Sequence, residues 1–145
     1  MDKNLLLSEP EQKSIVAAIH NAELRTSGEV RVHIEHHCPE SDVVERAKQV
    51  FVHLDMHKTE LKTGVLFYLA MTDRKFAVIG DAGIDQKVPA DFWNATRDVL
   101  KVHFAKNEFA EGLSAGIKSA GEQLQTYFPR QANDVNELPD DISFG

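Results

Sequence analysis

The sequence predicts an α/β fold, a three-layer α/β/α sandwich in which helices flank a small twisted mixed sheet. Segments with helical and strand-like patterns follow the order helix, strand, helix, strand, strand, helix, helix. The first strand, the next helix and the second strand form a right-handed crossover, so these two strands are expected to run parallel. A short turn leads to the third strand, which is therefore expected to run antiparallel to the second.

The first half of the chain contains two helices and one strand. Ser8 is a suitable N-cap for a helix that ends before Gly28. Residues 29–35 alternate between apolar and polar side chains, which indicates a strand with one buried face. Ser41 or Asp42 is expected to cap the second helix. The apolar side of that helix comprises Val43, Val44, Ala47, Val50, Phe51 and Leu54.

The second half contains two strands and two further helices. Residues 64–70 are almost all apolar, which is typical of a central strand covered on both faces. Residues 76–79 form the returning strand. One helix is expected to begin near Pro89, and a last helix is expected to run from a cap at Asn107 to Pro129.

The length of 145 residues is typical of one domain, which is assigned to residues 1–130. Residues 131–145 are polar and acidic and are expected to form a mobile C-terminal tail. Cys38 is the single cysteine, so an internal disulfide is impossible, and this fits a reducing compartment.

The charge and hydropathy pattern excludes several classes of function. Asp and Glu total 23 against 16 Lys and Arg, and the net charge of −7 argues against nucleic-acid binding and against docking on anionic lipid. No segment approaches the roughly 18 apolar residues that a membrane helix needs, so direct membrane insertion is not expected. The N-terminus does not have the pattern of a signal peptide. We therefore expect a cytoplasmic protein.

Three carboxylates form the strongest candidate site. In the predicted topology the end of the third strand lies at the same edge of the sheet as the start of the first strand, which brings Asp81 and Asp85 near Glu29. Clustered carboxylates repel one another unless they share a proton, a basic partner or a cation. Oxygen ligands suit Ca²⁺, with Mg²⁺ as the alternative. The competing interpretation is that both aspartates cap local structure and Glu29 faces water.

Other motifs favour a structural role. His53 and His57 have the spacing of paired metal ligands on a helix, but they lack the intervening glutamate of the zinc-protease motif, and we expect them to be surface histidines. His103 lies on an apolar helix face and is expected to be a satisfied core histidine. Residues 112–116 match the G-x-S-x-G nucleophile pattern but fall inside a periodic helix with no later histidine, so Ser114 is expected to serve helix packing.

Several segments resemble a known family in their order and spacing. They are residues 26–29, 63–66, 74–77, 80–81, 83–84, 92–93, 109, 112–113 and 116–117. Together they are similar to the TPM domain, a family that covers thylakoid lumen phosphatase-like, photosystem II repair and acetylcholine-receptor modulator proteins and many bacterial ones. The chain resembles a bacterial member.

The resemblance implies an α/β/α sandwich with an acidic groove that holds Ca²⁺ in some members, and an acid-phosphatase activity in some plant members. Glu29 and Asp81 occupy family-like positions, whereas Asp85 is added from spacing alone. The first functional hypothesis is a calcium-binding, non-catalytic interaction module that helps to assemble or maintain a complex with a membrane-associated protein partner.

The alternative is a metal-dependent acid phosphatase that acts on phosphomonoesters. Phosphoryl transfer needs Arg or Lys side chains at the anion. The nearest candidates in sequence are Arg25, Lys62 and Lys87.

Overall fold

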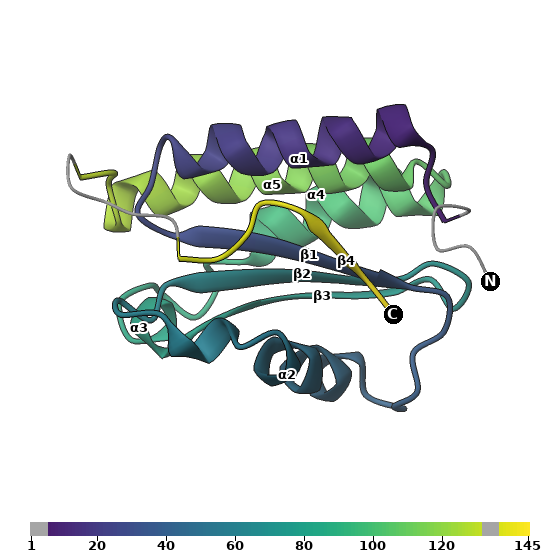
Figure 1. Ribbon diagram of the computed structural model, residues 1–145, viewed down its shortest axis with the longest axis horizontal. Coiled ribbons are helices and arrows are strands. Elements are labelled where there is room, and N and C mark those ends of the chain that lie inside the picture. Colours follow the sequence, from purple (N-terminus) through teal and green to yellow (C-terminus); the bar gives the residue numbers. More distant parts are fainter. Residues whose placement is uncertain (1–5, 132–136) are drawn as a thin grey trace.

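The computed structural model describes residues 6–131 and 137–145, and within them the strands form one mixed sheet of four strands (Figure 1). The strand order is β3 (Lys75–Gly80), β2 (Gly64–Ala70), β1 (Glu29–Glu35) and β4 (Ile142–Phe144). As predicted, β1 and β2 are parallel and β2 and β3 are antiparallel. The fourth strand is parallel to β1.

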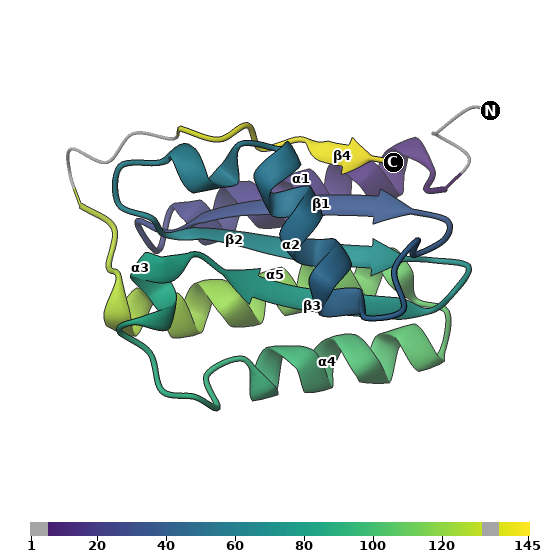
Figure 2. The same cartoon turned by 90° about the horizontal axis from the view of Figure 1, so that it is seen from below.

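Helices cover both faces of this sheet, which confirms the α/β fold. One face carries α1 (Glu9–Glu23), α4 (Asn94–Ala105) and α5 (Phe109–Tyr127), and the other carries α2 (Val43–His53) (Figures 1 and 2). Two short elements, η2 (Met56–Lys58) and α3 (Ala82–Asp85), lie at the end of the sheet where β1 and β2 begin. None of the helices in the described ranges is long and apolar enough to cross a membrane.

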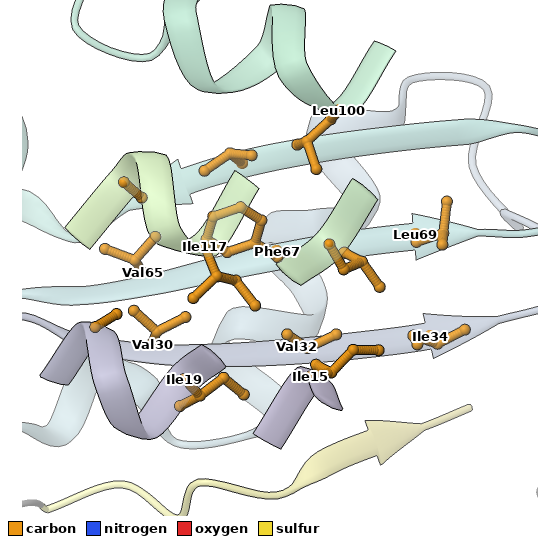
Figure 3. Packing of buried hydrophobic residues seen from close by; sticks show 14 of the residues in the cluster. Ile15, Ile19, Val30, Val32, Ile34, Val65, Phe67, Leu69, Leu100 and Ile117 are labelled. Atoms are coloured by element: carbon orange, nitrogen blue, oxygen red, sulfur yellow. The ribbon is translucent and has the colours of Figure 1, made fainter. Parts of the chain in front are cut away.

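The larger hydrophobic core lies between the sheet and the three-helix layer (Figure 3). Alternation in β1 directs Val30, Val32 and Ile34 into this core, where they meet Ile15 and Ile19 of α1. A smaller apolar cluster lies beneath α2. The continuous apolar sequence of β2 is explained by these two clusters, because every residue of that strand is buried.

The prediction that β1 has only one buried face is wrong. His33 and Glu35 point to the α2 side and are also buried. Arg46 of α2 contacts Glu35 with two nitrogens, Nε and Nη2, each 2.9 Å from a carboxylate oxygen, and the Tyr68 hydroxyl also donates to this carboxylate. These partners compensate the buried charge, so a polar side chain could be accommodated beneath a helix.

Helix boundaries agree with the sequence where a capping side chain sets them. Ser8 and Glu11 form the capping box of α1, and Asp42 accepts a hydrogen bond from the Val44 N–H, 2.9 Å away, to cap α2. The helix expected from Pro89 begins only at Asn94. The expected cap at Asn107 is wrong, because Asn107 has a φ of 61° and belongs to the tight turn before α5.

The C-terminal segment corrects the expectation of a mobile tail. Residues 137–145, which we term the C-terminal strap, are packed on the domain, whereas residues 132–136 lie outside the described ranges. In β4, Ile142 pairs with Val32 and Phe144 with Ile34. Leu138 is buried, 8% exposed, over the start of β2. The strap therefore completes both the sheet and the smaller apolar cluster.

Candidate functional site

A groove of about 470 Å³ lies where α2, the end of β3, α3 and the start of α4 meet. We call it the Asp81 groove; three of the elements that supply its lining residues, α2, α3 and α4, are labelled in Figure 2. Its lining residues are Val44, Lys48, Phe51, Val52, His57, Val78, Ile79, Gly80, Asp81, Asp85, Trp93 and Arg97. The groove thus combines an apolar floor with charged groups of both signs.

Asp81 follows directly after β3 and caps α3. Its Oδ1 accepts a hydrogen bond from the Ala82 N–H, 2.7 Å away. Its Oδ2 is buried, and no hydrogen-bond partner for it exists among the described residues. A buried carboxylate oxygen without a partner is costly unless a proton or a cation meets it.

Asp85 lies one helical turn after Asp81 and lines the same groove. Nearby protein atoms remove part of the water around its carboxyl, and the negative charge of Asp81 adds repulsion, so its pKa is raised. The Gly83 N–H donates to the Lys62 carbonyl oxygen, 2.9 Å away, and fixes this short helix. A Cβ at Gly83 would lie 2.5 Å from that oxygen, so the close approach requires glycine.

Glu29 lies at the same edge and on the same face of the sheet, but its carboxylate is already used. Its Oε1 accepts hydrogen bonds from the Glu137 N–H at 2.5 Å and the Leu138 N–H at 2.8 Å. Burial raises the pKa of Glu29, and these two donors partly oppose the rise. Glu29 is therefore part of the docking site of the strap.

Apolar side chains also separate Glu29 from Asp81. Gly64 lies between them in the sheet, since it pairs with Glu29 and its carbonyl oxygen accepts a hydrogen bond from the Asp81 N–H, 2.9 Å away. Met56 and Leu138 pack over Gly64. The structure thus brings Asp81 and Asp85 to one groove and leaves Glu29 outside it. Among the described residues, these three carboxylates do not form a group with ligand atoms within 4.8 Å of one another.

Comparison with known proteins identifies the family. The sequence profile of the TPM domain matches residues 1–123, which is most of the chain. The chain belongs to the TPM domain family. A comparison with curated proteins found no match.

Two solved structures resemble this TPM domain. The NMR structure of the BA42 protein from the psychrophilic bacterium Bizionia argentinensis has 46% sequence identity and a TM-score of 0.90, and the match covers 96% of this chain and 95% of that chain. The N-terminal domain of the cg2496 protein from Corynebacterium glutamicum has 13% identity and a TM-score of 0.68, with coverage of 90% and 81%. The second match shows the shared fold alone.

Sequence reasoning did not identify the cationic residues of the Asp81 groove. Lys48 of α2 and Arg97 of α4 line it in this TPM domain. Helical spacing carries the signal that could have found them, because Lys48 lies one turn from both Val44 and Val52, and Arg97 lies one turn from Trp93. Nothing in the sequence alone shows that these two helices border one groove.

The basic residues that the sequence suggested as partners for a phosphate group lie elsewhere or contact other groups. Lys62 Nζ donates to the His57 carbonyl oxygen, and Lys87 Nζ lies 4.9 Å from the centre of the Phe128 ring. Arg25 lines a different groove between α1 and α5. The positive groups available to a ligand of the Asp81 groove are therefore Lys48 and Arg97.

The histidines also differ from the sequence interpretation. His53 is the last residue of α2, whereas His57 belongs to η2, because Asp55 has a left-handed φ of 58° that interrupts the helix. His57 lines the Asp81 groove, and its buried Nδ1 has no hydrogen-bond partner within the described ranges. His103 is satisfied, as expected, because its Nδ1 lies 2.9 Å from Glu108 Oε1, but its side chain is 30% exposed and it is therefore not a core residue.

The G-x-S-x-G pattern lies inside α5, as the sequence indicated. Gly112 and Gly116 serve close packing, because a Cβ at either position would lie within 3 Å of side-chain atoms of α4.

Proposed function

We propose that this TPM domain binds a divalent cation, Ca²⁺ in the first place, at Asp81 and Asp85. In our proposal it acts as a non-catalytic interaction module that helps to assemble or maintain a complex with a membrane-associated protein. One observation supports the cation most directly. Asp81 Oδ2 is buried without a partner in the described structure, beside a second carboxyl whose pKa is raised partly by the Asp81 charge. A bound cation would relieve both effects.

The donor set fits calcium. Asp81 Oδ2 and the two oxygens of Asp85 offer three hard oxygens besides the Asp81 oxygen that caps α3, and Ca²⁺ accepts about six to eight oxygen ligands in flexible geometry, including water and oxygens from a partner. Mg²⁺ demands a tighter octahedron and is the second choice. Glu29 does not fit as a ligand in this arrangement, because its Oε1 already accepts two backbone hydrogen bonds.

The surface beside the two aspartates supports an interaction role. Val44 and Val52 of α2 line the groove and are 40% and 57% exposed. Apolar side chains exposed next to charged groups are typical of the surface that a protein partner covers. A partner that contributes a carboxylate could complete the coordination of the cation and cover these valines together.

The cation hypothesis is tested by calorimetry and by melting curves with EDTA, Ca²⁺ and Mg²⁺. Asp81→Asn is the informative variant, because asparagine keeps an oxygen for the Ala82 N–H but removes the charge. Wild-type protein should gain about 2.7 kcal/mol of stability at a hundredfold excess of Ca²⁺ over its Kd, and Asp81→Asn should lose this gain. Asp98→Asn, at an exposed position of α4, is the matched control.

Absence of a Ca²⁺-dependent rise in the melting temperature of the wild type would refute the site. An equal rise in Asp81→Asn would show that calcium binds elsewhere.

A second candidate function is favoured by Lys48 and Arg97. These side chains line the same groove as Asp81 and Asp85, and positive groups beside carboxylates are what a metal-dependent phosphatase needs to hold a phosphomonoester. A cation bound there would polarise a phosphoryl oxygen and lower the pKa of a bound water. Hydrolysis of p-nitrophenyl phosphate that is abolished by EDTA, by Asp81→Ala and by Arg97→Ala would support the enzyme over the interaction module.

A further inference from the structure

Three potential metal ligands converge where α4 passes into α5. His103 lies in the last turn of α4, Glu108 is the N-cap residue of α5, and Glu111 lies in the first turn of α5. One ligand atom from each side chain can be chosen so that all three lie within 4.8 Å of one another. Within the described ranges of the chain, no other group of His, Cys, Asp and Glu meets this criterion. The cluster is therefore distinct from the Asp81 groove.

The backbone holds these ligands in fixed positions. The turn between the helices is tight, with Asn107 at a φ of 61° and the Glu108 N–H 3.0 Å from the His103 carbonyl oxygen. A Cβ at Gly112 would lie 2.8 Å from the His103 Cβ, so only glycine lets α5 approach α4 this closely. Ligands carried by two packed helices are pre-positioned, which lowers the entropic cost of binding an ion.

The two carboxylates are not used in another structural role. Although Glu108 is the N-cap residue, its side chain makes no capping hydrogen bond, and its Oε1 instead lies 2.9 Å from His103 Nδ1. In the part of the chain that the structure describes, neither Glu108 nor Glu111 forms an ion pair with Lys or Arg. Two negative charges thus face one imidazole.

An ordinary ion pair explains only part of this arrangement. The dipoles of the two helices favour a basic side chain at the end of α4 and a glutamate at the start of α5. They account for the pair of His103 and Glu108. The dipole of α5 also favours a carboxylate at Glu111 in its first turn, but it does not require this carboxylate to lie within 4.8 Å of the ligand atoms of His103 and Glu108.

We infer that His103, Glu108 and Glu111 form a second metal site, which takes a divalent transition-metal ion of the Zn²⁺ class. One imidazole and two carboxylates are a donor set that zinc accepts, with water in the remaining tetrahedral position. The imidazole nitrogen separates this site from the oxygen-only pair of Asp81 and Asp85, which suits Ca²⁺. This site does not depend on the proposed function, because it uses other residues at the opposite end of α4 from Arg97.

The test is a titration of the full chain with ZnCl₂ in chelator-free buffer, followed by calorimetry and by NMR of the histidine ring nitrogens. Wild-type protein should bind one Zn²⁺ with a shift of the His103 Nδ1 resonance. Glu111→Gln should weaken zinc binding by at least about tenfold, since loss of even an outer-shell partner has that effect. Glu111 is exposed, so this variant should fold normally.

Glu122→Gln provides the matched control, because it makes the same change at an exposed position of the same helix and should leave the zinc affinity unchanged. Asp81→Asn should also keep the zinc affinity, which separates this site from the calcium site. The inference is overturned if the His103 ring does not respond to Zn²⁺, or if Glu111→Gln binds Zn²⁺ as tightly as Glu122→Gln does.

Discussion

Two acidic regions lie at the same edge of the sheet. They differ in whether the protein supplies hydrogen-bond donors to their carboxylate oxygens. At Glu29, two backbone N–H groups of the C-terminal strap donate to the carboxylate. At Asp81, one oxygen caps α3 and the other is buried with no partner among the described residues. The number of carboxylates alone therefore does not define a cation site. What matters is whether their acceptor oxygens are already satisfied by the protein.

A third carboxyl group, that of Glu23, lies close to Glu29 and is neutralised by a proton. Glu23 is buried, and this burial, together with a side-chain hydrogen bond to Asp140 of the strap, raises its pKa to about 9. Glu23 is thus protonated at neutral pH, when Glu29 is held by backbone donors. In the strap region, a proton on Glu23 and backbone donors to Glu29 meet the buried carboxyl groups, whereas in our proposal a cation would meet Asp81.

The largest effect is expected from removing the side chain that separates the two regions. Leu138→Ala should lower the free energy of unfolding by about 2–5 kcal/mol, because a buried leucine over Gly64 is replaced by a cavity. Leu61→Ala, at a side chain 55% exposed, should change it by less than about 0.5 kcal/mol. Urea denaturation measures both. Equal values would mean that the strap does not stabilise the domain.

The next effect concerns the proton on Glu23. Its folded-state pKa of about 9 lies above its ordinary value of 4.5, so its contribution to stability is full below pH 4.5 and is lost as the pH rises toward 9. Within this window the loss reaches at most about 1.4 kcal/mol per pH unit, so a change of one pH unit has a smaller effect than Leu138→Ala. Glu23→Gln cannot ionise and should flatten the decline, whereas Glu122→Gln should follow the wild type. A wild-type stability that rises steadily from pH 5 to 9 would contradict this assignment.

The smallest effect is expected from Glu29→Gln. Glutamine keeps an oxygen for the Glu137 and Leu138 N–H groups, so the free energy of unfolding should change by about 1 kcal/mol or less. The Ca²⁺-dependent rise in melting temperature should remain, in contrast to its loss in Asp81→Asn. Should Glu29→Gln abolish the calcium response, the two regions would act as one site, as the sequence first suggested.

The fold could be predicted from the sequence because the pattern that defines each element lies within a short segment of the chain. The alternation in β1, the apolar run of β2 and the caps at Ser8 and Asp42 each specify one element, and connection rules then arrange the strands. The same topology correctly placed Asp81 and Asp85 at the edge of the sheet where β1 and β2 begin. The position of these residues could be predicted from the sequence because it depends on the course of the backbone.

Contacts between distant segments could not be predicted in this way. The strap has few apolar residues within an acidic sequence, so its pattern resembles that of a solvated tail, although Leu138 and Phe144 pack on the domain. Because the strap packs there, its backbone N–H groups donate to Glu29, and this engagement could not be predicted either. Lys48 and Arg97 come from helices on opposite faces of the sheet, and only the folded chain shows that they share a groove.

The pairing of β4 with β1 has a consequence for how the chain folds during synthesis. His33 and its strap partner Ser143 are 110 residues apart, so the sheet cannot be completed until Ser143 has left the ribosome. Until then β1 presents an open edge that another nascent chain could pair with. Closing so long a loop is entropically costly, and strap docking should be a late step in folding. Docking of the strap therefore also protects the β1 edge from pairing with another chain.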